Sequence, residues 1–269
     1  PAGKKIGVAE DFAARTKIVA KPTDDLTLTL TGDYRNAKTS YGYNYNVDGR
    51  VGQDGLPPLP GYYDVVVTPG RAMDVKPLVW GLSGKLAYDA GAFTVTSLTS
   101  YQKVRIRIML DNDLITQDLV SAHEIGVSNT LQQEIQFASN GSGPFHWIGG
   151  LYFLDMESGF GGTHGLQLTG AGVGVTAPTA IDIRNTIKTK SYAVFAEVGY
   201  DLTEQTKLTL GARYTWDKRN IVGRTQLDAA FTGYSPVATL ATADFRTKIS
   251  DPTYRAILVQ HFTPDDMAF

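Results

Sequence analysis

Residues 191–220 read SYAVFAEVGYDLTEQTKLTLGARYTWDKRN, and this stretch decides the fold class. Between positions 208 and 216, apolar residues at even positions alternate with polar or small residues at odd ones, and positions 192–200 repeat the pattern. Successive side chains of an extended chain point to opposite faces, so a period of two predicts strands with one apolar face. The segment 201–205 joins the two runs, which predicts an antiparallel hairpin. The residues expected on its apolar face are Tyr192, Val194, Val198, Leu208, Leu210 and Tyr214.

The same alternation recurs along the rest of the chain and predicts an all-β, antiparallel fold. It is clear in residues 26–35, 78–88 and 131–137 and weaker in residues 13–20. Residues 145–155 are apolar on both faces, and residues 253–262 are ambiguous in the same way. Counted together with a further strand expected after residue 93, these segments predict nine strands, or ten if another begins at Met267.

The strand expected after residue 93 changes phase. Phe93, Val95 and Tyr101 set one apolar face, but further along Val104 and Ile106 occupy the opposite one. Two explanations are open. The strand could contain a β-bulge near position 102, or, if it crosses a membrane, it could leave the apolar zone of the membrane at that point.

The connections between strands alternate in length, which is the strongest structural indication in the sequence. Short turns are expected near residues 22, 90, 142, 203 and 265. Long segments rich in Gly, Pro, Asn, Asp and Thr are expected at residues 37–75, 111–129, 157–186 and 218–252. Outer-membrane barrels have short periplasmic turns and longer extracellular loops, so this asymmetry predicts a transmembrane β-barrel segment.

Aromatic residues near the ends of the apolar stripes support the same fold. Membrane barrels carry aromatic girdles at both interfaces, whereas cross-strand packing in a soluble sheet would explain each residue singly but not the set. The residues concerned are Tyr34, Tyr88, Tyr101, Tyr200, Tyr214 and Trp216.

Composition excludes several other classes of protein. The formal net charge is −2 and no dense Lys/Arg tract occurs, which argues against nucleic acid as a partner. The chain has no cysteine, so thiolate metal sites, thiol nucleophiles and disulfides are excluded. No run of about 18 apolar residues is present, which excludes a bundle of transmembrane helices.

Three segments resemble TonB-dependent receptors of the siderophore type. The hairpin at 191–220 has the family's aromatic-Ala pair, Tyr-Asp-Leu-Thr turn and Leu-Thr-Leu-Gly-Ala-Arg-Tyr-Thr return strand. TSLTSYQ at 96–102 also agrees, as does QQEIQFASNGSGPFHWIGGLYFLD at 132–155, which has Gln136 where the family usually has Arg. The matches occur in the expected order, and with the flanking strands they cover most of the chain.

The resemblance implies a receptor in the bacterial outer membrane that imports a scarce nutrient, most simply a ferric siderophore or similar iron complex. Its expected partners are outer-membrane lipid, a plug domain of the same parent chain, the TonB complex and the small-molecule iron complex. No TonB box, plug motif or aromatic-ended terminal strand is found. We therefore expect residues 1–269 to be part of a barrel of about 22 strands, with plug and C-terminal strands lying outside them.

Two sets of candidate functional residues follow. Polar residues opposite the apolar faces are expected to line the lumen, although a solvated sheet face would look the same: Arg35, Lys85, Glu134, Glu197, Lys207, Arg213 and Asp217. Aromatic and guanidinium groups in the loop 37–75 suit anionic aromatic chelates, although loop tyrosines that only pack on their neighbours are at least as common: Tyr41, Tyr43, Tyr45, Arg50, Tyr62, Tyr63 and Arg71.

No motif for catalysis, a cofactor or a metal is visible. The four histidines lack metal-ligand spacing, the glycine-rich segment 159–174 matches no phosphate-binding loop, and no nucleophile elbow occurs. We therefore expect a protein that is not an enzyme and has no cofactor. The alternatives to an active transporter are a passive porin or structural barrel and, less well supported, a soluble β-sandwich binding module.

Overall fold

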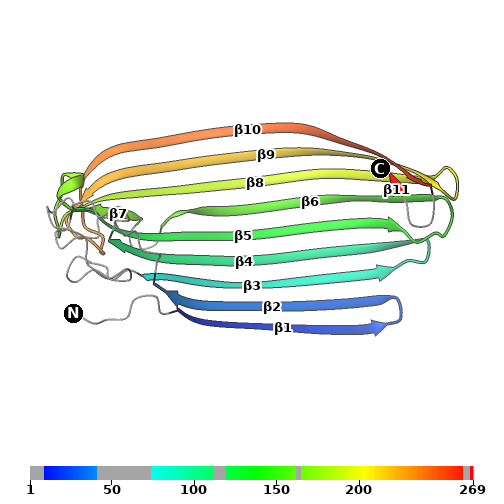
Figure 1. The fold of residues 1–269 in the computed structure, drawn as a ribbon, viewed down its shortest axis with the longest axis horizontal. Helices are drawn as coiled ribbons and strands as arrows, with labels where there is room; N and C mark the ends of the chain where they lie inside the picture. The colour runs from blue at the N-terminus through cyan, green and yellow to red at the C-terminus, as the bar shows by residue number, and fades with distance from the viewer. Residues whose placement is uncertain (1–8, 41–73, 112–118, 162–164, 263–266, 269) are drawn as a thin grey trace.

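The computed structural model describes residues 9–40, 74–111, 119–161, 165–262 and 267–268, which form one antiparallel sheet. Its strands run side by side along the long axis, with short turns at one end and the longer connections at the other (Figure 1). The elements are β1 (Ala9–Thr23), β2 (Leu26–Thr39), β3 (Asp74–Asp89), β4 (Phe93–Asp111), β5 (Ser121–Ser139), β6 (Phe145–Phe160), β7 (Leu166–Thr169), η1 (Ala171–Val173), β8 (Ala180–Asp201), β9 (Thr206–Asp228), β10 (Pro236–His261) and β11 (Met267–Ala268).

The strand count agrees with the sequence. Nine long strands occur in the expected order, and a tenth begins at Met267 and pairs with β10. The four-residue strand β7 is an addition that the sequence did not predict, and it pairs with both β5 and β8. Neighbours in the chain are otherwise neighbours in the sheet, and the order runs from β1 to β11. The all-β antiparallel prediction is therefore confirmed.

The strands are longer than the alternation predicts. β8, β9 and β10 extend far into segments expected to be loops, and only residues 229–235 separate β9 from β10. The expected loops at 157–186 and 218–252 are therefore wrong in extent, and the one at 111–129 is too long because β5 begins at Ser121. Towards this end of the sheet neither face is consistently apolar, so the alternation disappears from the sequence while the backbone ladder continues.

The expected bulge in β4 is wrong. Its pairing with β3 and with β5 is continuous from one end to the other, without a register shift near Gln102. The change of phase is instead a change in composition along one regular strand. Lys103 and Arg105 continue the side of the sheet that holds Tyr101, and Val104 lies on the opposite side.

Register divides the sheet into two faces. The apolar face carries Leu30, Leu82 and Val194, while the polar face carries Arg35 and Lys85. The hairpin predicted at 191–217 has the expected register, and its six named residues share the apolar face.

Two aromatic rows bracket the apolar face. The row towards the loops contains Tyr34, Trp80, Tyr101, Tyr192 and Trp216, and the row towards the turns contains Tyr88, Phe93, Phe137, Phe145 and Tyr200. Trp80 and Tyr88 are eight residues apart on β3, about 26 Å along a strand. At the strand tilt of about 40° in outer-membrane barrels, this spacing corresponds to roughly 20 Å along the membrane normal, comparable with the apolar band of about 25 Å that such barrels present to lipid.

Burial shows which face is the crowded, inner one. On β8, Ser191 and Ala193 of the polar face are 7% and 4% exposed, whereas Tyr192 and Val194 of the apolar face are both 44% exposed. Large apolar side chains therefore point outwards, the reverse of a soluble domain. A sheet that exposes its apolar face in this way needs a non-aqueous neighbour.

Candidate functional site

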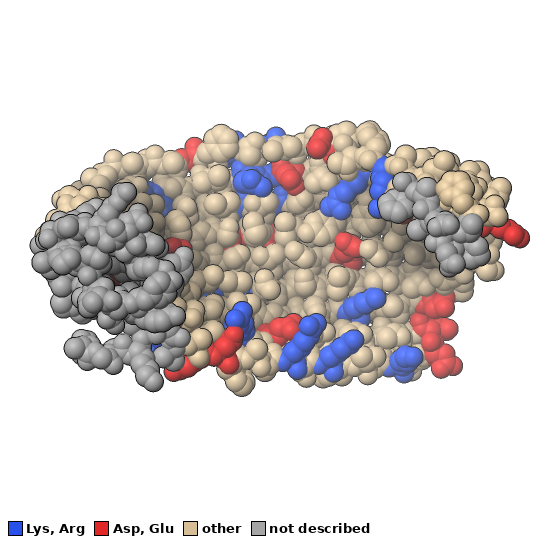
Figure 2. All heavy atoms as spheres, viewed as in Figure 1, with Lys and Arg blue, Asp and Glu red and all other residues tan. Residues whose placement is uncertain are grey.

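All seven polar residues predicted to line the lumen lie on the polar face of the sheet. The face presented in Figure 2 carries charged side chains of both signs along the middle of the strands, as the polar face requires. Their role in lining a lumen stays a prediction, but their common orientation follows from the register. The residues are Arg35, Lys85, Glu134, Glu197, Lys207, Arg213 and Asp217.

Five residues of β6, β8, β9 and β10 gather on this face, and we call them the polar-face cluster: Tyr152, Phe195, Glu197, Arg213 and Arg255. The guanidinium carbon of Arg213 lies 5.2 Å from the ring centre of Tyr152 and 5.9 Å from that of Phe195. Arg213 also donates from Nε to the hydroxyl of Thr215 at 3.1 Å. The aromatic rings and the hydroxyl thus hold this cation in place by cation–π attraction and a hydrogen bond.

Two glycines provide the space that the cluster needs. Gly211 lies between Glu197 on β8 and Arg255 on β10, and these two side chains form an ion pair across it. A Cβ at Gly211 would lie 3.3 Å from the Glu197 carboxylate. Gly150 on β6 leaves room for the ring of Phe195 in the same way.

The cluster presents chemistry for an anionic or carbonyl-rich partner. A guanidinium has five N–H donors in a planar fork, and Arg213 uses one of them in its hydrogen bond to Thr215. Glu197 and Arg213 were predicted from the sequence as polar-face residues, whereas Tyr152, Phe195 and Arg255 were not among the candidate residues. Tyr152 lies in a strand that is apolar on both faces and Arg255 in an ambiguous one, so only the pairing with β8 and β9 reveals their side.

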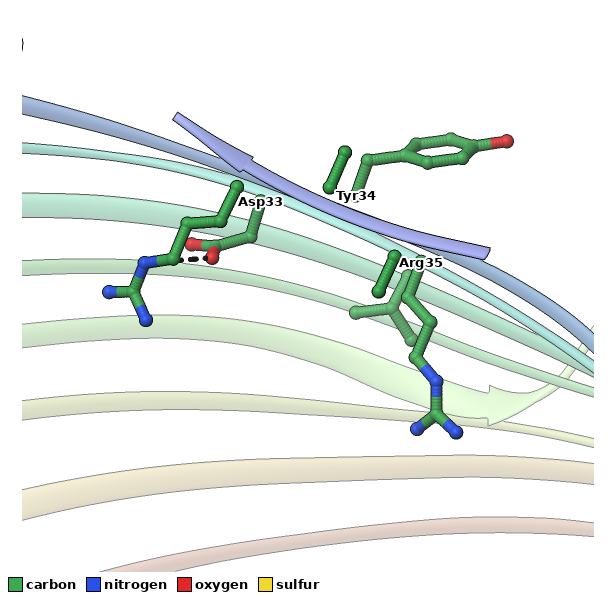
Figure 3. A pocket seen from close by; sticks show the side chains of 7 residues that line it. Asp33, Tyr34 and Arg35 are labelled. Carbon is green, nitrogen blue, oxygen red and sulfur yellow. Dashed lines mark ion pairs between the residues drawn. The ribbon is translucent and has the colours of Figure 1, made fainter. Parts of the chain in front are cut away.

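A hollow lies beside β1 and β2, near the free edge of the sheet. Figure 3 shows Asp33 and Arg35 pointing to one side and Tyr34 to the other, as alternation requires. Arg15 pairs with Asp33 at 3.3 Å, and Arg35 with Asp11 at 2.6 Å. Five of the seven lining residues are on the polar face, and one of them, Val79, belongs to β3, so the hollow lies over the polar face of these outer strands.

At the loop end of the sheet, a buried glutamine of β7 is hydrogen-bonded to the connection between β9 and β10. Gln167 of β7 is fully buried, donates to the carbonyls of Ala230 at 3.2 Å and Gly233 at 2.8 Å, and accepts from the N–H of Thr232 at 2.7 Å. Arg184 lies 3.7 Å from the ring centre of Tyr234 in the same connection. The segment 229–235 is thereby held against β7 and β8.

The seven candidate ligand residues of the loop 37–75 lie outside the described residues: Tyr41, Tyr43, Tyr45, Arg50, Tyr62, Tyr63 and Arg71. They stay a prediction.

Within the described part of the chain, no group of three or more His, Asp or Glu residues could hold a metal ion. His123 and Glu124 are adjacent on β5 and therefore point to opposite faces. The His123 ring, which is 4% exposed, lies edge-on to Phe231 with 6.5 Å between ring centres. Among the same described residues, no helix is long and apolar enough to span a membrane.

Comparison with known proteins agrees with this architecture. The family model described as TonB dependent receptor-like, beta-barrel matches residues 15–265. Among solved structures, the chain is similar to the ferric yersiniabactin uptake receptor FyuA from Yersinia pestis, with a TM-score of 0.70 and 10% sequence identity. That alignment covers 97% of this chain and 36% of FyuA, so this chain spans about a third of that structure. At this identity the likeness shows the fold alone.

A search of curated proteins found no match. The family assignment therefore rests on the family model, which spans nearly the whole sequence, and it agrees with the register, the two-faced sheet and the aromatic rows described above. The chain belongs to the TonB-dependent receptor-like β-barrel family.

Proposed function

We propose that this chain forms part of the barrel wall of an outer-membrane receptor. The receptor actively imports a scarce small molecule, most simply a ferric siderophore or similar iron complex. Family membership supports the receptor and its place in the bacterial outer membrane. The similar structure is that of a receptor for ferric yersiniabactin, which suggests the class of cargo. In this proposal the protein is a transporter and not an enzyme.

The polar-face cluster is the observation that carries the proposal. A barrel wall that only encloses water needs polar residues on its inner face but no ordered arrangement of them. Here the guanidinium of Arg213 lies within 6 Å of the centres of two aromatic rings, and Arg255 is paired with Glu197. Such fixed groups suit contact with a folded plug domain inside the barrel, which would close the pore and make transport depend on energy from TonB.

The test is transport by the full-length protein in cells with and without TonB. Under iron limitation, uptake of radiolabelled ferric siderophores should saturate with concentration and should stop in the strain that lacks TonB. Uptake that rises in proportion to concentration and continues without TonB would instead identify a passive porin.

The loop tyrosines give a sharper test of the cargo class. Tyr41, Tyr43 and Tyr45 occupy alternate positions, so in an extended segment they would form one aromatic surface. Replacing all three with Ala should weaken capture of the iron complex about tenfold or more, at about 1 kcal/mol per stacking contact. Whole-cell binding at matched surface expression measures this. Equal affinity of mutant and parent would assign the tyrosines to packing within the loop.

A further inference from the structure

Three cations on the apolar side of β4 continue the lipid-facing surface beyond its aromatic row. Lys103, Arg105 and Arg107 follow Tyr101 at alternate positions, share its face and are all exposed. Lys103 lies directly across from Trp80 on β3, and the rings of Trp80 and Tyr101 are 5.4 Å apart. Trp and Tyr mark the level of the lipid headgroups, so Lys103 lies at that level. Arg107 lies about 13 Å further towards the loops.

The positive charge of this surface has no counter-ion among the described residues. No ion pair is found for Lys103, Arg105 or Arg107 among the described residues. The residues facing them on β5 carry no charge, since Asn129, Val127 and Ile125 lie opposite.

Several other cations of the same face are paired, although Lys218 on β9 and Lys248 on β10 have no ion pair among the described residues. Lys188 binds Glu157 at 3.2 Å, and Lys190 binds Asp155 at 3.2 Å, just beyond the aromatic pair of β6 and β8. On β3, Lys76 binds Asp74 at 2.5 Å. Beyond the aromatic row, β6 and β8 therefore carry their own counter-ions, whereas β4 presents three cations without any.

We propose that Lys103, Arg105 and Arg107 form a binding surface for the phosphate groups of an anionic membrane lipid in the leaflet on the loop side. Guanidinium groups bind phosphate bidentately, and the apolar stems of Lys and Arg can lie along the sheet while their charges reach the headgroups. Trp80, Tyr101 and the apolar face below would contact the same lipid's acyl chains. This inference rests on the proposed location of the barrel in the outer membrane, but it does not depend on which molecule is transported.

The test is lipid binding by the full-length protein in nanodiscs of phosphatidylcholine with or without lipid A, a glucosamine lipid with two phosphates. Bound lipid A is counted by native mass spectrometry while its content is varied. The parent should retain lipid A selectively. The variant Lys103→Gln/Arg105→Gln/Arg107→Gln should lose roughly a hundredfold in affinity, since each cation near an anionic surface contributes about a factor of five.

A matched control removes the same charge from the opposite face. Arg15, Lys17 and Lys85 lie on the polar face, so their replacement with Gln should leave lipid A binding unchanged. The variant Arg105→Lys/Arg107→Lys keeps the charge and should keep most of the affinity. Excess inorganic phosphate should not displace the lipid, because the acyl chains also contribute to binding.

Three outcomes would overturn the proposal: retention of lipid A by the triple Gln variant, an equal loss in the control, or displacement by inorganic phosphate. The shift of the folded band on unheated gels checks that each variant is folded. If the triple variant does not fold, the single change Arg105→Gln should still weaken binding about fivefold, and unchanged binding would overturn the proposal. Transport is not the readout, so failure here leaves the proposed import function standing.

Discussion

At Gly150 in β6, the ring of Phe195 occupies the space that a side chain would need. A Cβ built there would lie 2.5 Å from the carbonyl oxygen of Ile135 and 2.6 Å from the ring of Phe195. The first of these atoms belongs to the backbone of the neighbouring strand and cannot move without disturbing the ladder. Glycine is therefore required by close packing and not by a turn, even though the sequence around it reads only as an apolar strand.

We expect Gly150→Ala to destabilise the barrel by about 1–3 kcal/mol, the usual cost of overpacking a well-packed site. The measurement is urea-induced unfolding of the full-length protein in detergent micelles. Gly143→Ala is the matched control, because a Cβ there would meet no atom within 4 Å. Equal midpoints for the two variants would contradict the packing argument.

Asp201, at the turn end of β8, connects two strands by charge. Its carboxylate lies 3.2 Å from Nζ of Lys207 and 3.4 Å from Nε2 of His146. The hydrogen bond from Lys207, followed by the attraction of that charge and the contact with His146, holds the pKa of Asp201 below its usual value.

A lowered folded-state pKa sets the direction of the pH dependence. The folded state binds the Asp201 proton more weakly than the unfolded state does, so the stabilisation is present above the unfolded pKa of about 3.9 and is lost as the pH falls through the folded pKa. Asp201→Asn should therefore lower the melting temperature slightly at pH 6, and the difference between the two proteins should shrink as the pH falls below about 3.9. Thermal melts of both proteins across this range test the prediction. A difference that persists at the acid end would point to packing instead of charge.

At the scale of elements, β7 takes over the place of β6 near the loops. β5 pairs with β6 as far as Gly126 and then with β7, and β8 changes partner in the same way. Gln167 extends this arrangement to the segment 229–235, where Thr232 adopts a left-handed φ of 67°. That conformation costs a non-glycine residue about 1–2 kcal/mol, and the hydrogen bond from its N–H to Gln167 offsets part of the cost.

Gln167→Ala removes three hydrogen bonds and leaves partly buried backbone groups without these partners, at a cost of about 1–3 kcal/mol. We expect amide hydrogen exchange in residues 229–235 to accelerate about tenfold or more, while the strands on the turn side stay protected. The control Gln132→Ala changes an exposed glutamine of β5 and should leave exchange unaltered. Unchanged protection in the Gln167 variant would mean that other contacts hold this segment.

For the molecule as a whole, the determining feature is a sheet with two edges and an apolar outer face. Along β1, Phe12 and Ile18 are 63% and 60% exposed, and along β10, Tyr254 and Leu258 are 80% and 55% exposed. Edge strands with free N–H and C=O groups pair with other chains, and transmembrane barrels avoid this by closing.

Residues 1–269 expressed alone should therefore associate into aggregates in aqueous buffer. Light scattering after size-exclusion chromatography measures the outcome. A monodisperse monomer that melts cooperatively without detergent would contradict both the barrel-wall interpretation and the lipid surface proposed on β4.

The sequence by itself determined the strands, their order and their two faces. Alternation along 191–217 settles which side each residue takes, because the side-chain period of a strand is two and does not depend on its partners. The aromatic residues at the ends of the stripes were also identified from the sequence, since Tyr34, Tyr88 and Tyr200 terminate apolar runs that can be read locally. The seven polar-face residues share one side for the same reason.

Only the tertiary structure decided how far the strands extend and which residues meet. The outer parts of β9 and β10 have no alternation to identify them, since their stability comes from the hydrogen-bonded ladder between strands. The polar-face cluster depends on register, because Arg213 reaches Tyr152 and Phe195 only through the pairing of β6, β8 and β9. Register is a property of strand pairs, and a single strand's sequence does not contain it.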